Sequence, residues 1–234
     1  MTQTMKAALL KGLPDLQLQL PEETADKLCA FGTAVVEQNA VMNLTAITEP
    51  EAVAKLHLLD SLTVLTVEDL SGKTIIDVGC GAGFPGVPVA IACPEAKVTL
   101  LDSLGKRMHW LETVLPQLGI SARCITARAE EAISEHREKF DFATSRAVAR
   151  LNILLELTAP YVRVGGAVLA LKGSAAREEL EEAKGAVKKL GLKVEKIQDF
   201  TIDGANHSVI VLRKIAHTPP QYPRRFAKIK QSPL

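Results

Sequence analysis

The chain has 234 residues, of which 47% are hydrophobic, and its 28 basic residues nearly balance 27 acidic ones. This length and composition predict one folded domain with an extension and exclude a largely disordered chain. No apolar run approaches the roughly 18 residues that a membrane-spanning helix needs. We expect no secretion signal and, because none of the four cysteines shows C-x-x-C spacing, no metal site and a cytoplasmic protein.

Residues 1–71 are predicted to form a helical N-terminal extension. Pro21, followed by two acids, is typical of the first turn of a helix. Apolar residues then recur at helical spacing, at Leu28, Phe31 and Val35. Pro50 opens a second helix in the same way.

Residues 72–214 alternate between apolar runs and amphipathic segments, which indicates a parallel sheet with helices on both faces. Amphipathic spacing predicts helices over 105–117 and 176–190. Only a few residues around Asp203 and Gly204 separate the last two strands, so these must pair as an antiparallel hairpin. Such a seven-stranded sheet resembles the α/β Rossmann-like fold of class I methyltransferases. The predicted strands are 74–78, 98–101, 123–126, 140–144, 167–171, 194–200 and 207–212.

The sequence after the first predicted strand is rich in glycine. Asp77 is the last residue but one of the strand, and glycines follow at 79, 81, 83 and 86. Glycine is favoured where φ must be positive or where a Cβ would block close approach. We therefore expect the backbone to contact a ligand here, with Asp77, Gly79, Gly81 and Phe84 at the site. A purely structural turn is the alternative.

The glycine spacing also matches the dinucleotide fingerprint, so an NAD-dependent oxidoreductase is an alternative function. Two features argue against it. Asp77 would repel a pyrophosphate, and Pro85 removes one of the backbone N–H groups that would bind it. S-adenosylmethionine carries no phosphate and has a sulfonium cation that acids suit. The sequence therefore favours S-adenosylmethionine as the cofactor.

Acidic residues follow the next two strands. Asp102 ends the second strand, where a carboxylate can bind a ribose diol; a helix N-cap is the alternative. Ala129 and Glu130 follow the third strand, where the adenine edge lies in this fold. The alternative for Glu130 is that it only favours the start of a helix.

Three residues are candidates for positioning a substrate. Arg146 and Lys172 follow the fourth and fifth strands, where each could bind a carboxylate or phosphate. His57 and Asp60 share one face of a helix and could form an acid–base pair. A structural histidine is the more common case, and no residue is expected to be an essential catalytic group.

The tail, residues 215–234, continues a basic stretch. From Arg213 to Leu234 there is no acid, so this stretch carries +6 and the rest of the chain −5. Such a tail indicates an anionic partner, with a solvated terminus as the alternative. Its six basic residues are Arg213, Lys214, Arg224, Arg225, Lys228 and Lys230.

The chain resembles the bacterial small-subunit ribosomal RNA guanine-N7 methyltransferase family, also called glucose-inhibited division protein B. The matching segments span nearly the whole chain and keep the same order as in the family. Those near the N-terminus and the C-terminus are the ones specific to this family. The matching segments are Met42–Ile47, His57–Ser61, Asp77–Gly86, Leu101–Ser103, Ser145–Ala147, Ala170–Gly173, Tyr222–Arg225 and Pro233–Leu234.

The resemblance implies methyl transfer from S-adenosylmethionine to N7 of a guanine in 16S ribosomal RNA, by in-line displacement that needs no general base. It implies cofactor contacts at Gly79, Phe84, Ala129, Glu130 and Arg146, with Asp102 on the ribose. It also implies a partly assembled small ribosomal subunit as partner, and we expect a monomer. A non-catalytic RNA-binding module and a methyltransferase for a small molecule or protein remain alternatives. Expected RNA contacts are Asn43, His57, Lys172, Arg224, Arg225, Lys228 and Lys230.

Overall fold

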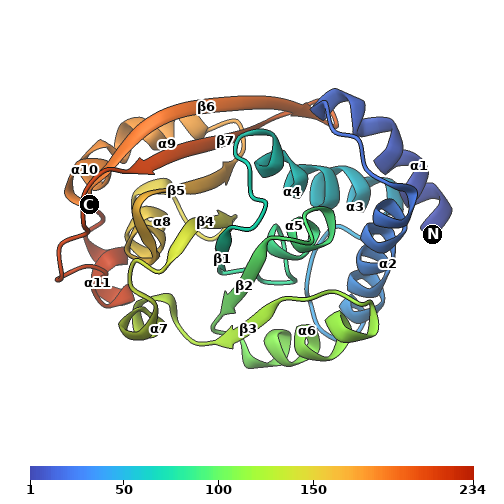
Figure 1. The fold of residues 1–234 in the computed structure, drawn as a ribbon, viewed down its shortest axis with the longest axis horizontal. Helices are drawn as coiled ribbons and strands as arrows, with labels where there is room; N and C mark the ends of the chain where they lie inside the picture. The colour runs from blue at the N-terminus through green and yellow to red at the C-terminus, as the bar shows by residue number, and fades with distance from the viewer.

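The structure, a computed structural model, describes residues 1–234. A seven-stranded sheet crosses the molecule, with helices on both faces (Figure 1). Its strands are β1 (Thr74–Val78), β2 (Lys97–Asp102), β3 (Arg123–Thr126), β4 (Phe140–Arg146), β5 (Val162–Lys172), β6 (Leu192–Ile202) and β7 (Ala205–Lys214). The predicted fold class is confirmed, and the structure extends most strands by one to five residues beyond the predicted bounds.

Helices connect the parallel strands and flank them. The N-terminal ones are α1 (Thr2–Gly12), η1 (Pro14–Leu16), α2 (Glu22–Asn39), α3 (Pro50–Val53), η2 (Ala54–Leu59), α4 (Asp60–Leu62) and η3 (Thr63–Thr66). The others are α5 (Gly86–Ala92), α6 (Gly105–Gln117), α7 (Ala129–His136), α8 (Leu151–Thr158), η4 (Ala159–Tyr161), α9 (Ala176–Glu182), α10 (Lys184–Lys189) and α11 (Phe226–Gln231). No helix is long and apolar enough to cross a membrane.

Of the two helices predicted in residues 72–214, one is confirmed and the other is divided in two. The one over 105–117 is α6, with the same bounds. The one over 176–190 is wrong as a single helix, because it is broken at Ala183, whose ψ of 1° departs from the helical value. Both pieces, α9 and α10, contact α8, so the break allows the segment to follow this helix.

The sheet order is β3-β2-β1-β4-β5-β7-β6. Strands β1 to β5 pair in parallel, whereas β7 pairs antiparallel with both β5 and β6. The predicted hairpin is confirmed. Asp203 and Gly204 form its two-residue turn with φ of 53° and 75°, the left-handed values that such tight hairpins require.

Alternate residues of the strands enter two separate cores. In β5, Leu169 and Leu171 face a core that the N-terminal helices share with α5 and α6. Val168 and Ala170 face a second core with α8, α9 and α10. This alternation is what a strand buried on both faces requires. The helices of residues 1–71 therefore pack directly on the sheet, while the division of the chain into three domains stays a prediction.

Strand order reverses between β1 and β4, because β2 and β3 lie on one side of β1, and β4 to β7 lie on the other. In open α/β sheets, ligands bind outside the carboxyl ends of the strands at such a switch point. The topology therefore places a candidate site at the ends of β1 and β4.

Candidate cofactor and substrate site

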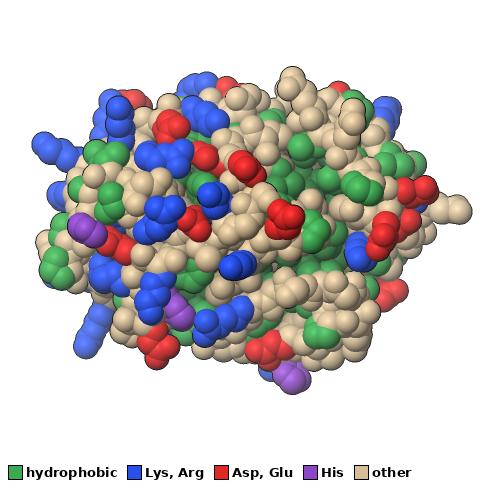
Figure 2. All heavy atoms as spheres, viewed as in Figure 1, with side chains coloured by type: hydrophobic (Ala, Val, Ile, Leu, Met, Phe, Trp, Pro, Cys, Tyr) green, Lys and Arg blue, Asp and Glu red, His purple; other side chains and the backbone are tan.

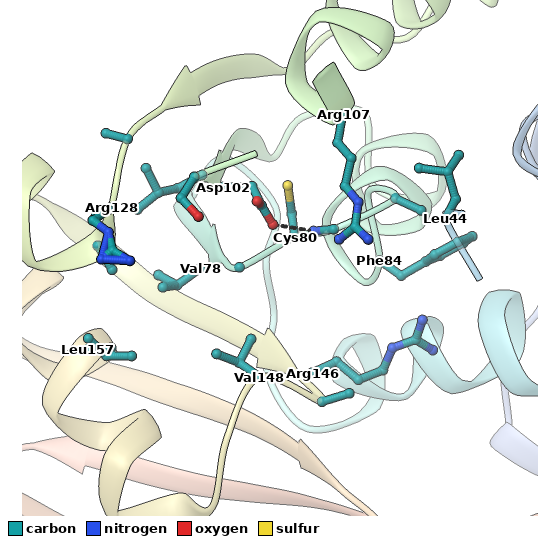
Figure 3. Close-up of a pocket in the computed structure, with 18 of the residues that line it drawn as sticks. Leu44, Val78, Cys80, Phe84, Asp102, Arg107, Arg128, Arg146, Val148 and Leu157 are labelled. Carbon is teal, nitrogen blue, oxygen red and sulfur yellow. Dashed lines mark hydrogen bonds between the residues drawn. The ribbon is translucent and has the colours of Figure 1, made fainter. Parts of the chain in front are cut away.

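A cavity of about 500 Å³ lies at the carboxyl ends of the strands around β1. Arg128 and Leu157 line one end, and Leu44 and Phe84 line the other, with Asp102 between them (Figure 3). Its size is within the usual range for small-molecule sites.

The glycine loop forms the floor of this cavity, and both Gly79 and Gly81 line it. Gly79 has a φ of +72°, and a Cβ at this position would lie 2.5 Å from Val148 Cγ2. Only glycine lets this loop approach the loop after β4 so closely. The backbone N–H groups of Gly79 and Cys80 donate to the Leu101 carbonyl, at 2.8 and 3.2 Å, which fixes the loop to the end of β2.

The Asp102 side chain also holds the glycine loop in place. Its Oδ2 accepts the Gly81 N–H at 2.9 Å, and its Oδ1 accepts the Leu104 N–H at 2.8 Å. A carboxylate has about four lone-pair sites, so each oxygen can accept one further hydrogen bond from the cavity. The N-cap-like contact and a ligand contact are therefore compatible at this residue.

Asp77, by contrast, lies behind the loop and does not line the cavity, because its side chain is fully buried. Its Oδ2 accepts the Gly86 N–H at 2.7 Å, so it ties the strand end to the start of α5. Burial raises its pKa to about 7, against the lowering effects of the Gly86 hydrogen bond and the Arg146 charge. This position corrects the expectation of a cofactor contact at Asp77, and the residue acts as a structural anchor.

The raised pKa of Asp77 predicts a pH-dependent stability. Between about pH 4 and pH 7 the unfolded chain loses this proton while the folded chain keeps it, so the free energy of unfolding falls as pH rises. We expect Asp77→Asn to remove this contribution. Urea unfolding at pH 5 and pH 8 should show a larger loss in the wild type than in the variant. Parallel losses, equal to those of an exposed control, Asp69→Asn, would contradict the assignment.

The other end of the cavity combines apolar surface with one acid and one arginine, Arg128. Ala129 and Glu130 line it, at the start of α7. Glu130 Oε1 lies 3.8 Å from Arg128 Nη1. Phe226, from the tail, also lines this end, and Arg128 lies over its ring at 5.9 Å. Sequence reasoning missed Phe226 because nothing in its neighbourhood shows that α11 folds back to the sheet edge.

Arg146 and His57 lie together at the Phe84 end. Arg146 Nη1 donates to Asp60 Oδ2 at 2.9 Å, and Nη2 contacts His57 Nδ1 at 3.0 Å. The His57 ring stacks on Phe84 at 4.6 Å between centroids. Burial and then the Arg146 charge lower the pKa of His57 to about 4, so the imidazole is neutral at pH 7. His57 belongs to a π-helical turn (η2), a feature that is frequent at functional sites.

Asp60 links Arg146 to His207. Its Oδ1 pairs with His207 Nδ1 at 2.8 Å. Burial acts to raise the pKa of Asp60, but His207 and Arg146 outweigh it and lower the pKa. Asp60 therefore stays ionised beside Arg146 instead of forming the acid–base pair with His57 that helical spacing suggested.

Lys172 and Arg224, two of the expected RNA contacts, form ion pairs within the protein. Lys172 is only 7% exposed and binds Glu179 at 2.8 Å and the Ala149 carbonyl at 2.6 Å. Arg224 binds Glu156 with two nitrogens, at 2.8 and 2.5 Å, and Glu156 is completely buried. Both side chains lie away from the cavity, so neither is free to meet a phosphate. The expectation that they contact RNA is corrected.

The basic stretch from Arg213 to Leu234 is less charged on its surface than its sequence suggests. Arg213 pairs with Glu68 and Glu195, and buried Lys214 lies 3.3 Å from Glu138. Of the six basic residues, three remain exposed and free of ion pairs, namely Arg225, Lys228 and Lys230. Asn43, the remaining expected RNA contact, is also exposed, and its carbonyl accepts from Arg107 at 3.2 Å. Nowhere do three His, Cys, Asp or Glu side chains gather in a way that could hold a metal ion.

Comparison with known proteins relates this geometry to a family. The family model "GidB: rRNA small subunit methyltransferase G" matches residues 24–209. Ribosomal RNA small subunit methyltransferase G from Desulfitobacterium hafniense is 41% identical, over 94% of this chain and 93% of the relative. The protein of the same name from Clostridium perfringens is 40% identical, over 96% of each chain.

Solved structures share the fold at lower identity. TYW2 from M. jannaschii, crystallised with AdoMet, has a TM-score of 0.56 at 15% identity and covers 68% of this chain and 76% of its own. YcgJ from Bacillus subtilis has a TM-score of 0.55 at 11% identity, over 68% and 100%. These likenesses concern the arrangement of the sheet and its helices.

Proposed function

The chain belongs to the rRNA small subunit methyltransferase G family, and we propose that it transfers the methyl group of S-adenosylmethionine to N7 of one guanine in 16S ribosomal RNA. The observation that carries this function is about 40% identity to named relatives over nearly the full chain, joined to a cavity at the sheet's switch point. The alternative of an NAD-dependent oxidoreductase is not supported, because the relatives are ribosomal RNA methyltransferases.

The cavity suits S-adenosylmethionine, which supplies an electrophilic methyl group when bound. We propose that Asp102 holds the ribose diol with the lone pairs that its backbone contacts leave free. The slot beside Ala129, Glu130 and Phe226 has apolar walls, one carboxylate and the Arg128 guanidinium. Its apolar walls fit a flat adenine, and its carboxylate fits the adenine amino group. Gly79, Gly81, Phe84 and Arg146 then surround the methionyl part. No phosphate-binding group is required for any of these contacts.

The acceptor chemistry explains the lack of a general base. Guanine N7 carries a lone pair, so no proton has to leave before it attacks the methyl carbon in line with the departing sulfur. His57 is neutral, with a pKa near 4, but guanine has no proton that His57 would need to remove before the attack. The task of the protein is alignment and exclusion of water, and alignment can supply at most about 7–11 kcal/mol.

We further propose that the exposed tail residues contact the RNA backbone of a partly assembled small subunit, and that the protein acts as a cytoplasmic monomer. Lys and Arg side chains gather over the part of one face where α8, α10 and α11 lie (Figure 2). Helix α11 also brings Phe226 to the cavity, so phosphates bound by its exposed residues would lie close to the reaction site.

This role predicts a change in salt dependence. Replacing Arg225, Lys228 and Lys230 with glutamine should reduce the slope of log affinity against log salt by about 0.7–0.9 for each phosphate that the variant no longer binds. The measurement is filter binding of small-subunit RNA over a range of salt concentrations. A matched control replaces Lys73, Lys97 and Lys139, which are exposed at the amino ends of β1, β2 and β4. Equal slopes for the two triple variants would contradict the role of the tail.

The proposed substrate is tested by labelled methyl transfer. Small subunits and naked 16S ribosomal RNA are prepared from cells that lack this protein and incubated with it and labelled S-adenosylmethionine. We expect label in the RNA of the subunits and less in naked RNA. Label in neither would contradict the function, and equal label would contradict the preference for an assembled particle.

A further inference from the structure

Thr45 reaches the cavity from the segment between α2 and α3, outside the sheet. The Asn39 side-chain oxygen accepts the N–H groups of Leu44 and Thr45, at 2.7 and 2.9 Å. These two bonds fix the backbone of the segment, so Thr45 is held in place at the cavity wall.

The hydrogen bonds that reach Thr45 have a defined direction. A guanidinium group can only donate, so the 3.0 Å contact with Arg146 Nη2 makes His57 Nδ1 an acceptor without a proton. Because His57 is neutral near pH 7, its one proton is on Nε2. This Nε2–H donates to Thr45 Oγ1 at 2.7 Å.

The Thr45 oxygen accepts a second bond from the Ile47 N–H at 3.0 Å. A hydroxyl oxygen has two lone pairs, and both are now used. The hydroxyl hydrogen remains, and no acceptor within the chain takes it. Towards the cavity, Thr45 can therefore act as a donor only.

Further hydrogen bonds keep the donor and acceptor roles of Arg146, His57 and Thr45 from reversing. Arg146 is fixed by Asp60 at 2.9 Å and by the Leu56 carbonyl at 2.8 Å. Asp60 is fixed in turn by His207 from β7 at 2.8 Å. The His57 ring lies flat on Phe84, and turning it over would place the Cδ2–H, which cannot accept a hydrogen bond, against the guanidinium.

We propose that Thr45 determines base specificity by donating its hydroxyl hydrogen to O6 of the acceptor guanine, with His57 and Arg146 as positioning residues. This inference rests on the proposed function. Beside N7, guanine presents the O6 acceptor, whereas adenine presents the N6 amino donor. A group that can only donate therefore fits guanine and opposes adenine.

The place of Thr45 in the cavity agrees with this assignment. Asp102 and the slot at Arg128 and Leu157 suit the ribose and adenine of the cofactor, so its methyl group would point towards the Phe84 end (Figure 3). Thr45 and His57 line that end. N7 must face the methyl group, which leaves O6 as the acceptor on that edge of the base for a protein group to bind.

The test compares the acceptor guanine with adenine at the same position. Small subunits of both kinds, from cells without this protein, are methylated in single turnovers, and S-adenosylmethionine affinity is measured by calorimetry. Because one neutral hydrogen bond is worth about 2- to 12-fold, we expect Thr45→Val to slow transfer to guanine by a factor in this range. The preference for guanine over adenine should fall similarly, with cofactor affinity within about twofold of wild type. Thr45→Ser, which keeps the hydroxyl, should restore the guanine rate.

A control and a second variant keep the test decisive. Thr48→Val changes an exposed threonine of the same segment that forms no side-chain hydrogen bond, and it should behave as wild type. His57→Phe keeps a ring on Phe84 but removes the donor to Thr45, so it should also lower the preference for guanine, even if Thr45→Val does not fold.

Two results would overturn the inference. One is transfer to guanine by Thr45→Val at the wild-type rate. The other is a loss of activity that follows a loss of cofactor affinity, which would place Thr45 on the methyl donor. If adenine is not detectably methylated by any variant, the contrast between valine and serine on guanine decides. Failure of the proposed function is distinct, because the wild-type protein would then label no guanine.

Discussion

Replacing Arg224 with alanine is expected to lower the free energy of unfolding by about 3–5 kcal/mol, because removing one partner of a buried ion pair leaves an uncompensated charge. Arg224 is the partner of Glu156, which is completely buried within α8. For a chain of this size the loss corresponds to a fall in melting temperature of about 6–20 °C. Thermal unfolding followed by circular dichroism measures it.

The neighbouring residue provides the control. Arg225 is exposed and forms no ion pair, so Arg225→Ala should change the free energy of unfolding by no more than about 0.5 kcal/mol. Adding Glu156→Gln to Arg224→Ala removes the unpaired charge and should recover part of the stability. If Arg224→Ala and Arg225→Ala were equally stable, the tail would not be held by this pair.

Replacing Asp102 with alanine should weaken S-adenosylmethionine binding by about 10- to 100-fold while the sheet remains folded. Charged hydrogen bonds are worth roughly 1.5–3 kcal/mol, and Asp102 would lose its bonds to the ribose. It would also lose its hold on the Gly81 N–H, so the glycine loop would be less well ordered for binding. Titration calorimetry with S-adenosylmethionine measures the affinity.

Asp69→Ala is a matched control for this variant. Asp69 Oδ1 accepts the Ser71 N–H at 3.0 Å, which is the same kind of local backbone contact. Asp69 precedes β1, so it lies at the amino ends of the strands, away from the cavity. We expect its affinity to equal that of the wild type. Unchanged binding by Asp102→Ala would exclude the ribose contact, whereas equal weakening in both variants would indicate a general loss of structure.

Much of the fold could be predicted because it depends on local patterns. Alternating strands and helices indicate a parallel sheet, and a two-residue Asp203-Gly204 turn is too short for anything but a hairpin. The glycine loop and Asp102 follow strand ends, and the carboxyl ends of parallel strands lie at one edge of a sheet. Their meeting at one cavity therefore follows from the order of the elements alone.

The errors concern the direction and partners of side chains. Asp77 lies near the end of a strand, and its sequence position does not reveal that the carboxylate turns into the interior, towards the Gly86 N–H. The ion pairs of Lys172 and Arg224 cannot be predicted from the sequence, because neither partner is set by a local pattern. Glu156 is 68 residues before Arg224, and no local pattern connects the two.

The hydrogen-bond network around His57 was equally hidden from the sequence. Helical spacing paired His57 with Asp60, but Arg146, 86 residues after Asp60, binds both and keeps them from acting on each other. In the sequence, Thr45 is distinguished only by its place in the matching segment Met42–Ile47. Its significance depends on which nitrogen of His57 carries the proton, and that follows from the Arg146 contact in the folded protein.

Methylation of guanine N7 is tested most directly by mapping modified nucleosides in 16S ribosomal RNA by mass spectrometry, from cells with and without this protein. We expect one 7-methylguanosine that is present only with the protein and that returns when the purified protein and S-adenosylmethionine are added to the deficient small subunits. An unchanged set of 7-methylguanosines, or a methyl group on another atom or another RNA, would contradict this expectation.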